Sequence, residues 1–166
     1  RCFLAQIAAT YLVGLALAQA RGTKYPDEVA REYAALEAMP AAVATVLETV
    51  EPVRALARDL ADRGTVLFLG RHVGYPVALE GALKLKELAY MHAEGFAAGE
   101  LKHGPIALIE DGVPVIIVMP SPTGRALLHS KMVSNIREIQ ARGATTIVIA
   151  EEGDESARGV ADHLIV

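Results

Sequence analysis

Apolar and polar positions recur at helical spacing through residues 1–63, which predicts helices and no strands in that part of the chain. Three helices are expected, the second running to Ala38 and the third towards Asp62. Their ends are marked by a closing glycine, a capping aspartate and a first-turn proline: Gly22, Asp27 and Pro40. The first part of the chain is therefore expected to be a helical segment.

From residue 64 the pattern changes to short β-branched runs that alternate with helical stretches. Such runs are typical of buried parallel strands. We expect strands over 65–69, 114–119 and 145–150, with a fourth starting at 163–166. The alternation predicts an α/β fold, a doubly wound parallel sheet with helices on both faces, because each right-handed crossover lays its helix on the sheet. Ligands in such folds bind outside the carboxyl ends of the strands.

Two loops follow expected strands at that edge of the sheet. The first, Gly70–Pro76, has glycines that allow close backbone approach and opens a helix expected over 76–91, whose N-terminus attracts anions. The second, Pro120–Gly124, contains Ser121 and Thr123, residue types that cap helices more often than they bind phosphate. Most loops of this kind bind nothing, so neither predicts a ligand by itself.

The helix expected over 76–91 carries charges inside an apolar pattern. At 3.6 residues per turn, Glu80, Lys84 and Glu87 share one stripe, with two carboxylates on either side of one ammonium group. One interpretation is a solvent-exposed stripe with a Glu–Lys pair. The other is a partly buried acid/base cluster, in which the lysine keeps a carboxylate ionised and burial raises its basicity. The spacing does not choose between them.

Histidines follow this helix in a segment rich in alanine and glycine. His92, Glu94 and His103 could supply three metal ligands, but no HExxH pairing or Cys/His cluster accompanies them, so we expect no metal. His103 lies in a polar tetrapeptide that ends at Gly104, which suggests a proton carrier. A lone loop histidine is nevertheless more often structural or merely exposed.

Length and composition narrow the class of protein. The 166 residues suffice for one domain with a buried core, and a net charge of -4 with scattered signs gives no nucleic-acid footprint. Cys2 is the only cysteine, so no intramolecular disulfide forms, and no signal peptide is recognisable. A cytoplasmic location is therefore expected. The apolar run Ile7–Ala18 is roughly a dozen residues, against the ~20 of a membrane span, so we expect a buried helix and no membrane partner.

The string ALEGALKLKELAYMHAEGFAAGELKHGPIALI resembles one family. It is similar to the second sugar-isomerase (SIS) subdomain of glutamine:fructose-6-phosphate aminotransferases (isomerising), also called glucosamine-6-phosphate synthases. The likeness is dense from Leu67 to Val118 and looser on either side, with ALEGALKLKE and GELKHGP as its most specific parts. It implies that residues 1–63 are the end of a first SIS subdomain with connecting helices, and that residues 64–166 are a C-terminally truncated second SIS subdomain.

The resemblance also implies a reaction and residue roles. In the family, fructose 6-phosphate is ring-opened, ammonia from glutamine adds to C2, and a proton moves from C1 to C2, giving glucosamine 6-phosphate without cofactor or metal. Glu87 matches the glutamate that carries the proton. His103 matches the ring-opening histidine, which acts in the site of a neighbouring subunit. Lys84 matches a lysine near the sugar, and Glu80 a further glutamate of the site region.

Departures from the family pattern limit the expected activity. No serine- and threonine-rich phosphate loop, C-terminal lysine or glutaminase sequence is present, and Cys2 lacks the surroundings of a glutaminase nucleophile, so a buried packing role is expected for it. The expectation is a fragment that is inactive alone, whose partners are the glutaminase domain, the first SIS subdomain and a second copy in a homodimer. The alternative is a non-catalytic SIS module that binds a phosphosugar or dimerises.

Overall fold

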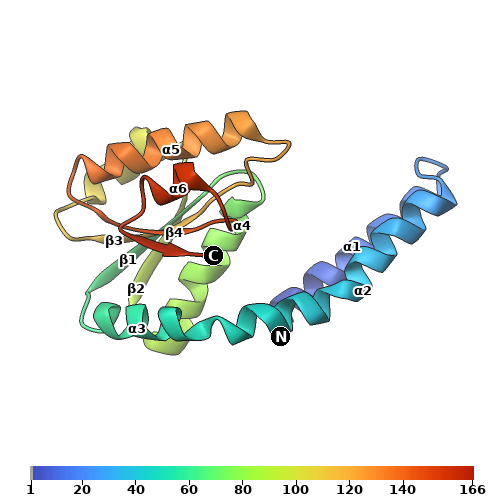
Figure 1. The fold of residues 1–166 in the computed structure, drawn as a ribbon, viewed down its shortest axis with the longest axis horizontal. Coiled ribbons are helices and arrows are strands. Elements are labelled where there is room, and N and C mark those ends of the chain that lie inside the picture. The colour runs from blue at the N-terminus through green and yellow to red at the C-terminus, as the bar shows by residue number, and fades with distance from the viewer. Residues whose placement is uncertain (1) are drawn as a thin grey trace. The chain divides into compact units, whose positions relative to one another are not determined.

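The computed structural model describes residues 2–166, without the side chain of Cys2, so the packing role expected for that side chain lies outside what is described. The chain divides into two compact units, one up to Pro52 and one from Val53 to Val166 (Figure 1). The boundary falls within helix α3, Val50–Leu60. Each unit is described by itself.

The first unit is a pair of helices, α1 (Cys2–Ala20) and α2 (Pro26–Glu48). Gly22, with φ of 65°, closes α1 as predicted. The predicted start of the second helix was two residues late, because Tyr25 is the N-cap and its N–H donates to the Glu28 carboxylate at 2.7 Å. The predicted end was also wrong, since α2 continues through Pro40. A proline inside a helix removes one backbone hydrogen bond, and in α2, which buries no residue, water can replace it.

Helix α1 is longer and more exposed than the sequence predicted. It has 19 residues, and among residues 3–20 only Leu15 is buried, because α2 is its one packing partner within the unit. The prediction of a buried helix was therefore wrong. By length and composition Phe3–Ala20 could cross a membrane, a property that core helices and signal sequences share. That one helix is weak evidence for a membrane.

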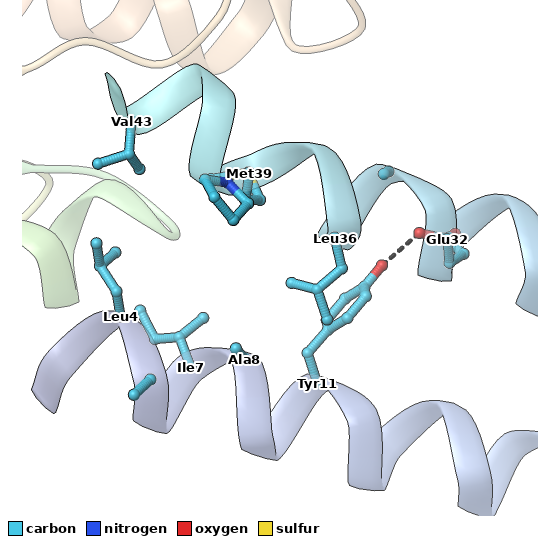
Figure 2. Close-up of a pocket in the computed structure, with 11 residues that line it drawn as sticks. Leu4, Ile7, Ala8, Tyr11, Glu32, Leu36, Met39 and Val43 are labelled. Carbon is cyan, nitrogen blue, oxygen red and sulfur yellow. Dashed lines mark hydrogen bonds between the residues drawn. The ribbon is translucent and has the colours of Figure 1, made fainter. Parts of the chain in front are cut away.

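An apolar groove of about 700 Å³ runs between α1 and α2, and the contact between Tyr11 and Glu32 forms part of its lining. Figure 2 shows the Tyr11 hydroxyl directed at the Glu32 carboxylate, to which it donates a hydrogen bond. Lys24 also pairs with Glu32, at 3.2 Å. The hydrogen bond to Glu32, with smaller contributions from burial and the Glu32 charge, raises the pKa of Tyr11. The bond from Tyr11 and the contacts with Lys24 lower the pKa of Glu32.

Tyr11 is therefore expected to ionise at higher pH than an unperturbed tyrosine, for which the pKa is ~10. Ring-carbon NMR of the tyrosines across an alkaline titration measures this directly. In Glu32→Gln the carboxylate charge is absent, and the Tyr11 midpoint should move down. The matched variant Glu37→Gln, an exposed glutamate on the same helix, should leave it in place. An unchanged Tyr11 midpoint in Glu32→Gln would contradict the contact.

The second unit contains a five-stranded parallel sheet in the order β2-β1-β3-β4-β5. The strands are β1 (Thr65–Gly70), β2 (His92–Ala97), β3 (Pro114–Val118), β4 (Thr145–Ile149) and β5 (His163–Ile165). The four predicted strands are confirmed. The sequence analysis missed β2, whose residues HAEGFA include glycine and charge and have low strand propensity. Pairing with β1 along its whole length makes it a strand.

Strand β1 shows why helices cover both faces of the sheet. Its side chains alternate, so Val66 and Phe68 pack with α4 (Gly74–Lys84), whereas Leu67 and Leu69 join a core with α5 (Ala126–Gln140) and α6 (Glu155–Arg158). Figure 1 shows α4 on one side of the sheet and α5 with α6 on the other. A Cβ at Gly81 would lie 2.7 Å from the Phe68 ring, so this glycine lets α4 approach the sheet. The predicted α/β doubly wound fold is confirmed.

Candidate functional site

The predicted acid/base stripe lies at the end of α4, where the helix changes its geometry. The α-helix stops at Lys84, and Leu85–Ala89 form a π-helical turn, η1, that ends at Tyr90 with φ of 56°. The helix expected over 76–91 therefore starts two residues earlier and is not α-helical at its end. Single π-turns inside helices are frequent at functional sites.

This geometry brings together the three predicted residues of the stripe. Lys84 Nζ donates to Glu87 Oε2 and lies 3.6 Å from Glu80 Oε1. The side chain of Glu80 is 24% exposed, while Lys84 and Glu87 are about half-exposed, at 45% and 50%. The cluster of two carboxylates around one ammonium group is therefore present, and it is open to solvent on one side.

The carboxylates determine the charge state of the lysine. The hydrogen bond to Glu87 raises the pKa of Lys84; burial opposes this, and the charges of Glu87 and Glu80 add to the rise. Lys84 is thus held as the ammonium ion. Its positive charge therefore lies beside the Glu87 carboxylate, a group that can accept a proton.

His103 lies on a separate turn after β2. Residues Leu101–His103 form a short 3₁₀ helix, η2, anchored by the fully buried Leu101. The His103 ring is 72% exposed, and its Nδ1 lies 2.7 Å from Glu100 Oε2. Glu100 orients the ring and fixes which nitrogen faces solvent. Because the side chain is exposed, it can reach a molecule outside this unit.

The structure does not bring His103 together with the stripe. Helix α4 begins beside the carboxyl end of β1, and its π-helical end at Ala89 precedes the start of β2. His103 follows the other end of β2. Leu101 of the His103 turn belongs to the core with α5, whereas Leu85 of the π-helical turn packs in the core with α4, so His103 and Glu87 lie on opposite faces of the sheet. One chain therefore presents Glu87 and His103 on different surfaces.

The candidate metal ligands of the sequence analysis are not gathered into one site either. His92 and Glu94 belong to β2, with exposed side chains, and His103 lies on the turn η2 that follows it. Among the described side chains, no group of three histidine, cysteine, aspartate or glutamate residues is placed to hold a metal ion. In the loop after β3, the Ser121 hydroxyl accepts a hydrogen bond from the Thr123 N–H at 3.1 Å, as in a local turn.

A profile of the SIS domain matches residues 59–166, about two thirds of the chain. The chain belongs to the SIS domain family. The match covers the whole sheet and the helices on both of its faces, and so includes the stripe and the His103 turn.

Relatives within this family are similar over nearly the whole chain. The glutamine--fructose-6-phosphate aminotransferase [isomerizing] of Mycolicibacterium paratuberculosis is 78% identical over 165 residues, 99% of this chain and 26% of the relative. The protein of the same name from Streptomyces coelicolor is 67% identical over 99% of this chain and 27% of its own length. This chain thus spans about a quarter of the length of these relatives.

A solved structure is also similar over nearly the whole chain. The C-terminal domain of glucosamine-fructose-6-phosphate aminotransferase from Francisella tularensis superimposes with a TM-score of 0.89 and 32% identity, covering 98% of this chain and 45% of that chain. The SIS fold and the preceding helices therefore occur together in a related solved protein.

Two polar contacts of this SIS domain were missed by sequence reasoning. Arg71 donates from Nε and Nη2 to the buried amide oxygen of Asn135, and His129 Nε2 lies 2.7 Å from Asp154 Oδ2. The partners are 64 and 25 residues apart in sequence. No local spacing signals such pairs, and only the sheet topology brings them together.

Proposed function

We propose that this chain is the sugar isomerase module of a glutamine:fructose-6-phosphate aminotransferase, converting fructose 6-phosphate and ammonia to glucosamine 6-phosphate. The observation that carries the proposal is the contact of Lys84 with both Glu80 and Glu87. These contacts occur in a chain that is 78% identical, over 99% of its length, to an aminotransferase of that name. Composition and fold alone would suit many α/β proteins.

The stripe supplies the proton transfer in this proposal. Once ammonia has added to C2 of the open sugar and the C2 hydroxyl has left as water to give the imine, the Glu87 carboxylate takes a proton from C1 and returns it to C2. Lys84 pairs with the Glu87 carboxylate and contributes positive charge near the sugar oxygens. Glu80 holds the ammonium group from its other side. Glu87 and Lys84 are the proposed catalytic residues, and Glu80 is a proposed substrate-site residue.

His103 opens the sugar ring in the same proposal, but in another subunit's site. Its place on the α5 face of the sheet, opposite the α4 face that carries Glu87, supports this division, because the sheet separates the two groups within one chain. A homodimer then completes each site by exchange of His103. Its high exposure leaves the ring free to enter a neighbouring site.

The module needs other parts of a longer polypeptide. We propose that residues 1–63 belong to the end of a first SIS subdomain and its connecting helices, and that residues 64–166 form a second SIS subdomain. A glutaminase domain would supply the ammonia. The coverage of about a quarter of each relative supports such a context. The single cysteine is consistent with the reducing cytoplasm, which we propose as its location.

A chimera tests the function. In the Mycolicibacterium paratuberculosis relative, the matching 165-residue segment is replaced by this sequence, and glucosamine 6-phosphate formation from fructose 6-phosphate and glutamine is measured. We expect a rate within about tenfold of the unmodified enzyme, a loss of no more than ~1.4 kcal/mol of transition-state stabilisation. A folded chimera that hydrolyses glutamine but makes no product would reject the proposal.

The 166-residue chain alone serves as the comparison. Binding energy from the phosphate of the substrate normally positions the reacting carbons, so a chain without the family's serine-rich phosphate loop should form little product from fructose 6-phosphate and ammonia. Product formation by this chain at the chimera's rate would show that the other segments are dispensable. Phosphosugar binding by a chimera without turnover would favour the non-catalytic alternative.

A further inference from the structure

The turn that carries His103 is attached to α5 by packing and by one ion pair. Leu101, in η2, is fully buried in the core that contains residues of α5. The next residue, Lys102, places its Nζ 2.9 Å from Oε1 of Glu138, which lies in the last turn of α5. His103 follows directly, so the two residues before it fix the turn to the helix.

The Glu138 carboxylate is paired at one oxygen only. Its Oε2 is buried, and within residues 2–166 it has no hydrogen-bond partner. A carboxylate with one oxygen enclosed in this way depends on the cation at its other oxygen, because an uncompensated charge at a partly buried site is costly. Lys102 is 63% exposed, and pairs of that exposure add little to stability. The contact is therefore suited to fixing the position of the turn rather than to stabilising the domain.

The contact between His103 and Glu100 lies within the turn itself. His103 Nδ1 is 2.7 Å from Glu100 Oε2, and both side chains are exposed, so Glu100 orients the ring relative to the turn and not relative to the sheet. Gly104 has φ of 149°, a conformation that favours glycine, and the turn ends at this residue. The place of the ring relative to the domain therefore depends on Leu101 and on the pair Lys102–Glu138.

We infer that Glu138 is a positioning residue for His103, holding the turn through Lys102 at the place where the ring meets the sugar. The inference rests on the proposed function, in which His103 opens the ring of fructose 6-phosphate bound in a neighbouring subunit. In ring opening the bond between C2 and the ring oxygen breaks, the ring oxygen gains a proton and the C2 hydroxyl loses one. An imidazole that carries either proton must lie within hydrogen-bond reach of these atoms. A displacement of about 1 Å at such a group costs up to roughly 10²-fold in rate.

Two substrates test the inference in the chimeric enzyme. Fructose 6-phosphate has to be ring-opened, whereas 5-deoxyfructose 6-phosphate has no C5 hydroxyl, cannot close the ring and needs no opening. We expect Glu138→Gln to lower kcat/KM for fructose 6-phosphate about 10- to 100-fold and to leave kcat/KM for the open-chain analogue within about twofold. Retained activity on the analogue also shows that the variant is folded. Glu110→Gln, a change at an exposed glutamate, is the matched control and should alter neither value.

Further variants separate this inference from the proposed function. His103→Gln should show the same selective loss on fructose 6-phosphate, whereas Glu87→Gln should slow both substrates, because proton transfer from C1 follows ring opening. Lys102→Gln should resemble Glu138→Gln, and the double variant should lose no more than either single variant, since both changes remove one contact.

The outcomes that contradict the inference are distinct. A selective loss in His103→Gln without one in Glu138→Gln would overturn the inference and leave the proposed function intact. Equal losses on both substrates in Glu138→Gln would show a structural role and overturn it as well. No selective loss in His103→Gln would reject the ring-opening role, and the inference with it.

Discussion

Glu87→Gln is expected to slow glucosamine 6-phosphate formation by the chimeric enzyme about 10²–10⁴-fold, the usual contribution of a general base. Glutamine keeps the shape of the side chain but has no carboxylate to accept the C1 proton. Lys84 also loses its negatively charged partner, so the charge of the whole stripe changes. The measurement is the initial rate of glucosamine 6-phosphate formation at saturating fructose 6-phosphate.

Exchange of the C1 proton distinguishes a role of Glu87 in proton transfer from a structural role. In deuterium oxide, exchange at C1 of the sugar should disappear with Glu87→Gln, while glutamate release from glutamine continues near its normal rate. Glu110→Gln, an exposed glutamate outside the stripe, should alter neither quantity. If Glu87→Gln retains both product formation and C1 exchange, then another group moves the proton and the role proposed for Glu87 is wrong.

The sequence predicted the stripe well because its signal is local. Glu80, Lys84 and Glu87 are joined by helical spacing alone, and the structure shows the predicted contacts of Lys84. The π-helical turn was not predictable from that spacing, since it depends on where the helix meets β2. The sequence also left the solvent exposure of the stripe undecided, because the pattern of apolar positions does not show whether another part of a longer chain covers it.

Elements that depend on distant partners were predicted less well. The strand β2 has weak intrinsic propensity and forms because β1 offers it a complete ladder of pairs. Pro40 is a helix breaker by local rules, yet an exposed helix tolerates it. Arg71 and Asn135 belong to different elements, so their contact follows from the sheet topology rather than from any motif.

The buried pair His129–Asp154 has the largest expected effect on stability. The two side chains are 9% and 4% exposed, and His129 Nε2 lies 2.7 Å from Asp154 Oδ2. The other carboxylate oxygen accepts a hydrogen bond from the Ala157 N–H at 2.9 Å, which caps α6. One carboxylate thus ties α5 to the loop after β4. Removing one partner of a buried pair leaves the other without compensation.

Asp154→Ala is therefore expected to lower the free energy of unfolding by about 3–5 kcal/mol at neutral pH, measured by urea denaturation. Asp154→Asn keeps an oxygen that can cap α6. Its free energy of unfolding should therefore fall by about 1 kcal/mol less than that of Asp154→Ala. Glu155→Ala, a change at the neighbouring exposed glutamate, should shift the free energy by no more than about 0.5 kcal/mol. Equal stabilities for Asp154→Ala and Glu155→Ala would show that the pair contributes nothing.

The pH dependence of this loss follows from the pKa of Asp154. Burial raises that pKa, but the hydrogen bonds from Ala157 and His129, with the His129 charge and the Ser156 N–H, outweigh burial and lower it. A carboxyl group with a lowered pKa stabilises the fold fully above the unfolded value of ~3.9, and the contribution disappears as pH falls through the folded value. The unfolding free energies of the unmodified chain and Asp154→Ala should therefore differ most at neutral pH and converge below about pH 4. A difference that stays constant across that range would mean that Asp154 contributes by packing and not by its charge.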